Sequence, residues 1–312
     1  MKIMKPYRLQ LTGVEVAIPT LVTELVEAGR YALASIQSDP ETAIHDFRRF
    51  MKMARAALKL GRSAMDTGDF TVVNCLLRDA QGYVSGHRDE DALVEICALA
   101  RKKQRKPVAR LLEQVEEHLR ARKISLSTQV IGVAGDALTL TAQAIDLLRN
   151  PRFHTVFPPE KVIAEGIRRG YAAGRRHFRK ALAGAAPQET WHAWRKRAKD
   201  TRYQVTFVSS LWPAYFRTWE EELHHLTDFL GRQRDLFLLV ERLQQPETSL
   251  PDATPEAITT LLEALETIRL DQARKALTLG RKIYLEPPGW WGRRVKKLWR
   301  ARDNQDNHEH DG

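Results

Sequence analysis

Residues 41–65 read ETAIHDFRRFMKMARAALKLGRSAM, and this stretch decides the fold. At about 100° per residue, apolar side chains such as Phe47, Met51 and Ala54 fall on one side of a helix and the cations on the other. The preceding Asp39-Pro40 is typical of a helix start. The cations continue through Lys59 and Arg62, over about 25 Å of helix axis. The stretch therefore predicts an amphipathic bundle helix with a long basic face.

The basic part of this stretch occurs twice. Residues 45–55 (HDFRRFMKMAR) and 192–202 (HAWRKRAKDTR) both read H-x-x-R-[RK]-x-x-K-x-x-R, 147 positions apart. A second matched pair follows, YVSGHRD at 83–89 and FLGRQRD at 229–235, at an offset of 146. Two matched pairs at nearly one offset predict an internal duplication.

Each copy of the motif places one histidine and three cations within about 80° of arc on a helix. Like charges three or four residues apart repel by about 0.2–0.5 kcal/mol per pair, which favours a dense anionic partner. The alternative is an ordinary solvated basic face. The shared-face residues are His45, Arg48, Lys52 and Arg55, then His192, Arg195, Lys199 and Arg202, with Arg49 and Lys196 beside them.

Long stretches without Gly or Pro predict an all-α chain. We expect two helical bundles related by pseudo-twofold symmetry. They would form one domain at 10–300, with repeats at about 15–149 and 160–290, and a disordered tail at 301–312. The expected helices are 15–37, 41–65, 69–98, 104–121, 127–149, 160–184, 187–212, 214–245 and 254–285.

The net charge of +11 implies an anionic partner but does not choose among nucleic acid, a membrane surface and a phosphate polymer. Both halves are basic, with 22 Lys/Arg against 18 Asp/Glu in residues 1–150 and 28 against 21 in the rest. Cys75 and Cys97 lie in apolar stretches and are expected to be buried thiols. No apolar run reaches a membrane-spanning length, so we expect a soluble cytoplasmic protein.

Other cations could extend the site. A basic group on residues 168–180 includes Arg169, Arg175 and Arg176, and Lys282 follows much later in the chain. Arg88 and Arg234 each precede an aspartate, and these pairs serve either the anion site or an interhelical salt bridge. The basic aromatic segment 289–300 could stack on bases, rest on a membrane or pack on the bundle, and packing is the expected role of its tryptophans.

The two histidines could contact phosphate or only orient the site. Neither has a carboxylate or second histidine three or four residues after it, so no metal site is expected. The chain lacks a Gly-rich phosphate loop, GxSxG, HExxH and CxxC, and no carboxylate set is typical of a magnesium site. These observations favour binding without turnover, and no cofactor is expected.

The motifs resemble those of the CHAD family, the conserved histidine α-helical domain. HAWRKRAKDTRY at 192–203 is similar to the family signature H-x-x-R-K-x-x-K-x-x-R-Y, and LGRQRD at 230–235 is similar to its L-G-x-x-R-D element. The stretch 280–291 resembles the family's C-terminal helix and aromatic end. The resemblance covers about residues 10–300. Many relatives also carry an N-terminal triphosphate-tunnel domain with an ExExK strand, which this chain lacks.

The resemblance implies an all-α fold of two four-helix bundles with internal pseudo-symmetry, enclosing a basic central groove. It also implies non-enzymatic binding of inorganic polyphosphate and association with polyphosphate granules. The first copy departs from the family at VSGHRD, which leaves Arg88 a weaker candidate than Arg234. A nucleic-acid binder and a histidine-dependent phosphoryl-transfer enzyme are the alternatives. Oligomeric state is left open. The candidate binding residues are His45, Arg48, Arg49, Lys52, Arg55, Lys59, Arg88, Arg169, Arg175, Arg176, His192, Arg195, Lys196, Lys199, Arg202, Tyr203, Arg234 and Lys282.

Overall fold

The computed structural model describes residues 7–84, 86–102, 104–154, 158–184, 186–245 and 253–310, and for 86–90, 122–131 and 303–310 it describes the helical backbone alone. Within these ranges the regular structure is helical, which confirms the all-α prediction. The helices are α1 (Val14–Leu33), α2 (Pro40–Gly61), α3 (Thr67–Tyr83), α4 (Gly86–Arg101), α5 (Lys106–Arg149), α6 (Pro159–Leu182), α7 (Gln188–Phe207), the short 3-10 helix η1 (Ser209–Leu211), α8 (Pro213–Leu243), α9 (Pro255–Ile283) and α10 (Pro288–His310).

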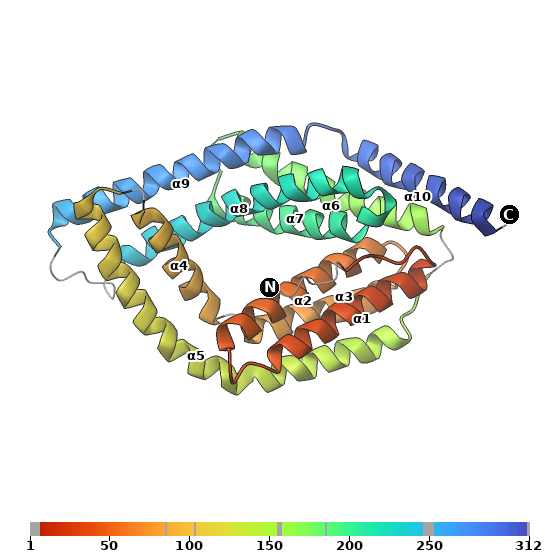
Figure 1. The fold of residues 1–312 in the computed structure, drawn as a ribbon, viewed down its shortest axis with the longest axis horizontal. Coiled ribbons are helices and arrows are strands. Elements are labelled where there is room, and N and C mark those ends of the chain that lie inside the picture. Colours follow the sequence, from red (N-terminus) through yellow and green to blue (C-terminus); the bar gives the residue numbers. More distant parts are fainter. Residues whose placement is uncertain are drawn as a thin grey trace.

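Helices α1, α2, α3 and the second part of α5 form one bundle (Figure 1). Its core includes the fully buried side chains of Leu25, Phe47 and Leu77. Helix α2 starts where the sequence predicts, because Asp39 caps it by accepting from the Thr42 N–H at 3.1 Å. The apolar face of α2, with Phe47, Met51 and Ala54, is buried in the bundle.

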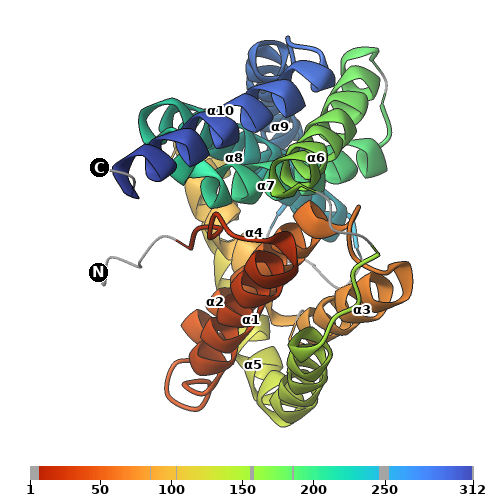
Figure 2. The ribbon, with the colours of Figure 1, turned by 90° about the vertical axis from the view of Figure 1, so that its right-hand side faces the viewer.

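A second layer is built from α6, α7, α8, α9 and α10 (Figure 2). Trp194 of α7 is fully buried, and its ring lies 5.4 Å from that of Phe178 on α6. Trp291 and Trp299 of α10 are buried against this layer, which is the packing role that we expected for them. Aromatic burial of this size is a large contribution to the stability of the layer.

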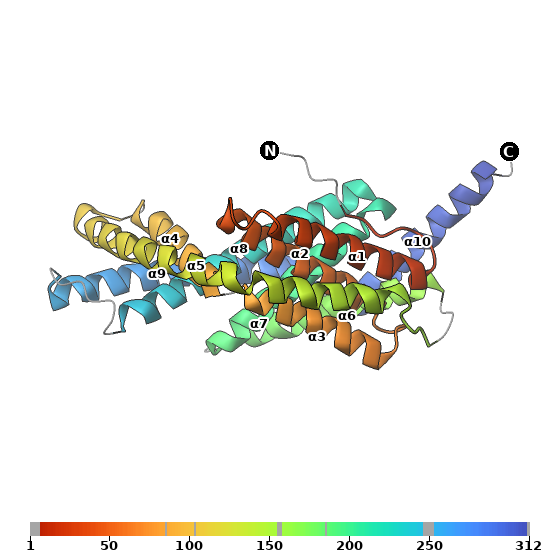
Figure 3. The ribbon, with the colours of Figure 1, turned by 90° about the horizontal axis from the view of Figure 1, so that it is seen from below.

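A separate cluster lies at one end of the elongated molecule (Figure 3). Here α4 and the start of α5 pack against the end of α8 and the start of α9. Cys97, Leu112, Leu236 and Leu265 are fully buried in this cluster. It therefore joins the first half of the chain to the second away from the main core.

The helices differ most from the prediction in three places, apart from ends that lie up to five residues earlier than expected. The stretch 69–98 is two helices, α3 and α4, and glycines on both sides of the break (Gly82 and Gly86) weaken a continuous helix. The expected helices 104–121 and 127–149 are the single helix α5, since no Gly or Pro separates them. Helix α10 includes residues 301–310, which we expected in a disordered tail.

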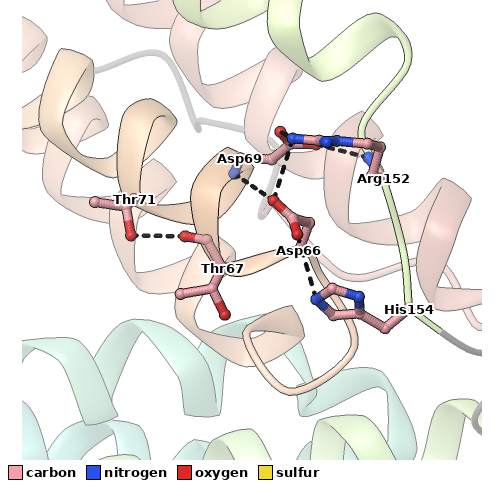
Figure 4. Close-up of polar contacts among 6 residues, drawn as sticks. All are labelled: Asp66, Thr67, Asp69, Thr71, Arg152 and His154. Carbon is pink, nitrogen blue, oxygen red and sulfur yellow. Dashed lines mark hydrogen bonds and ion pairs between the residues drawn. The ribbon is translucent and has the colours of Figure 1, made fainter.

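A polar network ties the end of α5 to the start of α3 (Figure 4). Asp66 caps α3 by accepting from the Asp69 N–H at 3.0 Å. The Arg152 guanidinium donates to Asp69 at 2.7 Å, and His154 Nε2 lies 3.4 Å from Asp66 Oδ2. These contacts close the first bundle at the side where the chain leaves for α6.

Candidate functional site

The two layers touch where α2 lies against α6 and α7. Gly166 of α6 faces the main chain of α2, where a Cβ at this position would lie 2.6 Å from the Leu60 carbonyl oxygen. Gln204 of α7 is buried, and its side-chain amide donates to the Ala56 carbonyl at 3.2 Å. A glycine and a buried amide thus allow the three helices to approach until their polar side chains share one hollow.

A pocket of about 500 Å³ opens over this junction, and we call it the central pocket. Seven of its lining residues are Lys or Arg, and one is a carboxylate, Asp200. The cations are Lys59 on α2 and Arg62 at its C-cap, Arg168, Arg169, Arg176 and Lys180 on α6, and Arg197 on α7. Such a charge imbalance in a confined space favours an anion.

Asp200 is held by cations from two helices. The Lys59 ammonium donates to Asp200 Oδ2 at 2.8 Å, and the Arg197 guanidinium donates to the same oxygen at 3.1 Å. The side chains of Lys59 and Asp200 are 24% and 16% exposed, so this pair is only partly screened by water. Burial lowers the pKa of Lys59, and the Asp200 charge opposes that change. The carboxylate therefore stands where an anionic ligand would also bind.

More cations surround the pocket. Arg55 of α2 donates from Nε to the Asn74 side chain of α3 at 3.1 Å. Burial lowers the pKa of Arg55 and of Lys196. The positive charge of Arg197 lowers both pKa values further, and that of Arg234 also lowers the pKa of Lys196. An arginine stays protonated under these conditions, so neighbouring positive charges repel one another. A bound anion would relieve that repulsion.

A second pocket of about 550 Å³ lies between α7 and α8, and we call it the α7–α8 pocket. His192, Lys196 and Arg234 line it, together with two glutamates. Arg197 lines this pocket as well as the central pocket. The basic surface is therefore continuous along α7.

His45 occupies a different environment, which we call the acidic pocket. This pocket of about 240 Å³ lies at the start of α2. Its titratable lining consists of His45 and four acids, Glu41, Asp91, Glu95 and Asp235, and no Lys or Arg belongs to the described lining. The described titratable lining is thus mostly acidic, unlike that of the central pocket, although Asp235 lies 3.8 Å from the Arg234 guanidinium.

Two arginines of the first motif hold α2 to its surroundings. Arg48 is 8% exposed and donates to the Val84 carbonyl at 3.3 Å. Arg49 lies 3.1 Å from Asp46, and its guanidinium sits 5.0 Å from the centre of the Phe50 ring. Neither residue lines the central pocket or the α7–α8 pocket.

The second motif shows a similar division. The Arg195 guanidinium lies along Gly231 of α8, where a Cβ would come within 3.5 Å of its Nε. Arg202 Nη1 lies 2.9 Å from His224 Nδ1 on α8, and its guanidinium is 5.6 Å from the centre of the Tyr203 ring. These side chains of α7 face α8 and do not line the two basic pockets.

The remaining predicted residues are dispersed. Lys52 and Lys199 are half-buried on α2 and α7, and Lys282 is exposed near the end of α9. Arg175 donates from Nε to the Tyr284 carbonyl at 3.0 Å. The side chain of Arg88 lies outside the described part of the structure.

Several pocket residues were not among the predicted binding residues. They are Arg62, Arg168, His177, Lys180, Arg197 and Asp200. Arg197 and Asp200 fall outside the face shared by the motif residues, because helical spacing places them roughly 80–140° from His192. The motif alone does not reveal that this other side of α7 faces α2 and α6. The basic run at 168–180 was a usable signal for Arg168, His177 and Lys180.

His177 is the titratable group of the central pocket that responds near neutral pH. Its imidazole is half-buried on α6. Burial lowers its pKa, and the positive charges of Arg197, Arg176 and Lys180 lower it further. The ring is therefore mainly neutral at pH 7 while the pocket is empty of anion, since the unperturbed pKa is about 6.5.

The described residues contain neither a metal-binding cluster nor a helix that could span a membrane. No cluster of three or more His, Cys, Asp or Glu side chains is arranged to hold a metal ion. Within the same residues, no helix has the combination of length and apolar composition that a membrane span needs. Cys75 and Cys97 are both free thiols, with Cys97 buried and Cys75 half-buried.

Comparisons with known proteins agree with the architecture. The chain is similar in fold to a solved structure titled PptA from Streptomyces chartreusis, with a TM-score of 0.57, 16% identity, and coverage of 88% of this chain and 98% of that one. The CHAD domain from the plant Ricinus communis gives a TM-score of 0.57 and 19% identity, covering 88% and 97% of the two chains. No curated protein sequence matched. The sequence model of the CHAD domain matches residues 20–244, and the protein therefore belongs to the CHAD domain family.

Proposed function

We propose that this protein binds inorganic polyphosphate, or a chemically similar linear phosphate polymer, in the central pocket and along α7. The observation that carries the proposal is the set of seven Lys and Arg side chains that share one pocket with a single carboxylate. Arginine binds phosphate oxygens as a two-pronged donor and lysine as a point charge, so the lining suits successive phosphate groups.

The lining favours a phosphate polymer over a nucleic acid. Single-stranded nucleic acids are held by basic grooves in which aromatic side chains stack on the bases. No Phe, Tyr or Trp belongs to the described lining of the central pocket. A polyanion without bases does not need aromatic side chains for its binding.

The chemistry of the lining supports retention of the polymer without cleavage. No Ser, Thr, Cys or Tyr belongs to the described lining, and the one carboxylate already accepts from Lys59 and Arg197. We further propose that this binding places the protein on polyphosphate granules.

A competition titration tests the proposal. Labelled long-chain polyphosphate is bound at physiological salt and challenged with duplex DNA, single-stranded RNA, ATP and free phosphate. The double variant Arg176→Ala/Lys196→Ala removes one exposed cation from each basic pocket. The matched control, Lys102→Ala/Lys106→Ala, removes two exposed cations, one just after α4 and one at the start of α5.

We expect unlabelled polyphosphate alone to compete tightly. The pocket variant should bind about tenfold more weakly, because each of the two lost cations reduces the binding constant by roughly threefold to fivefold. The affinity of the control should stay within twofold of that of the unchanged protein. Equal competition by DNA, or an equal loss in the control, would show a generic basic surface and favour the nucleic-acid alternative. Phosphate release in the presence of Mg²⁺ or Mn²⁺ would instead support the enzyme alternative.

A further inference from the structure

Helix α6 carries a second basic hollow beside the central pocket, and we call it the outer pocket. It has a volume of about 330 Å³ and is lined by four cations, Arg175, Arg176, Arg179 and Lys180, with Ala172 and Pro288. Arg176 and Lys180 also line the central pocket. The two hollows therefore adjoin, with these two side chains on the boundary.

The outer pocket has a fixed wall. Arg175 donates from Nε to the Tyr284 carbonyl at 3.0 Å, which holds the connection between α9 and α10 against α6. Tyr284 itself is buried, and its ring stacks on that of Phe178 at 5.5 Å. The position of Pro288 in the lining is thus set by the core of the second layer.

The charges of the outer pocket are not balanced by the protein. Its described lining contains no Asp or Glu, and within the described residues no ion pair involves Arg176, Arg179 or Lys180. The central pocket differs, because Asp200 there neutralises part of the charge. Cations three and four residues apart on α6 repel each other, and an anion lying across them would remove that repulsion.

We propose that the outer pocket continues the polyanion site, so that a long phosphate chain leaves the central pocket over Arg176 and Lys180 and lies against Arg179. This inference rests on the proposed function. The track from Arg169 to Lys180 spans about 16 Å along α6, at 1.5 Å per residue. A short oligophosphate is held within the central pocket, whereas a long chain gains the outer contacts as well.

Chain-length dependence tests the inference. Tripolyphosphate and long-chain polyphosphate are titrated against the unchanged protein and the variant Arg179→Glu, which alters an exposed side chain that lines the outer pocket but not the central pocket. Arg110→Glu makes the same charge change on an exposed residue of α5, near the separate cluster where α4 and α5 pack against α8 and α9, and serves as the control. Circular dichroism and thermal unfolding verify that both variants fold.

We expect Arg179→Glu to weaken long-chain binding by about tenfold, equivalent to two counterions, and to change tripolyphosphate binding by less than twofold. An equal loss for both ligands, or no loss for the long chain, overturns the outer-pocket inference while leaving the central site intact. Absence of binding of either ligand to the unchanged protein overturns the proposed function itself.

Discussion

Asp200 should limit the affinity of the central pocket for phosphate, and Asp200→Asn tests this directly. Its Oδ2 accepts from both Lys59 and Arg197. A phosphate group that binds to these cations must displace or share that carboxylate. Asparagine keeps the shape and one acceptor oxygen but removes the charge, so the two cations become available to the ligand.

The expected magnitudes follow from the two ion pairs. Gaining one or two cations for phosphate raises the binding constant by about fourfold to fifteenfold at physiological salt, and steepens the salt dependence by about 0.7–1.4 in log–log slope. Loss of charged hydrogen bonds at a site that is 16% exposed costs about 1–2 kcal/mol of folding stability. That corresponds to a decrease in Tm of about 1.5–3 °C for a chain of 312 residues.

The assay pairs polyphosphate titrations at several salt concentrations with thermal unfolding. Asp146→Asn is the matched control, because Asp146 forms an exposed ion pair with Arg149 on α5 and its loss changes the net charge equally. The control should shift stability by less than about 1 kcal/mol and leave the affinity nearly unchanged. Unchanged or weaker binding by folded Asp200→Asn would refute the reasoning, and would mean that Asp200 positions the cations without competing for them.

Three further predictions follow from particular contacts. Gly166→Ala should destabilise the protein by about 1–3 kcal/mol through overpacking and weaken polyphosphate binding. The control Gly82→Ala, where a Cβ meets nothing within 4 Å, should be neutral or stabilising. Unfolding curves measure the stability of the two variants, and titrations measure their affinity. Polyphosphate binding should take up a proton and strengthen as pH falls from about 8 to 6, since a bound anion raises the lowered pKa of His177. The variant His177→Gln should flatten the dependence of affinity on pH, and an unchanged dependence would contradict this role. Burial raises the pKa of Cys97 to about 12, so its alkylation at pH 8 should require unfolding, while the half-buried Cys75 should react in the native protein, as peptide mass analysis would show.

The local structure of the chain was largely predictable from its sequence. The amphipathic stretch 41–65 and its preceding Asp39-Pro40 placed the start of α2 correctly, because N-capping and apolar periodicity are determined by neighbouring residues. The break between α3 and α4 was missed, because a glycine inside an apolar pattern does not by itself end a helix. The side chains that meet at the central pocket come from three helices distant in sequence.

The direction in which each motif side chain points could not be read from one helix. Helical spacing put Arg48 on the basic face of α2, yet it is buried and donates to the Val84 carbonyl, because α2 is enclosed by neighbours on more than one side. Spacing likewise separated Arg197 from the motif face of α7, although it bridges both basic pockets. Packing partners decide which side of an amphipathic helix becomes a site.

The pockets at the starts of α2 and α7 bear on the internal duplication, which stays a prediction. Glu41, Thr42 and His45 line the acidic pocket, and the residues 147 positions later, Gln188, Glu189 and His192, line the α7–α8 pocket. Asp91 lines the first hollow and Phe237, at the offset of 146 found in this part of the chain, lines the second. Equivalent positions enclosing equivalent hollows favour two copies of one ancestral unit.

The described charges of the two hollows differ nevertheless. Four acids line the hollow of His45, whereas three cations and two glutamates line that of His192. A phosphate chain following positive charge would therefore pass His192 and avoid His45, although the two histidines head the same motif. On this reasoning the two halves share an architecture but divide its use, with the anion held by the second half and by the side of α2 that faces it. The cations of α6, which have no counterpart in the first half of the sequence, then extend the site in the same direction.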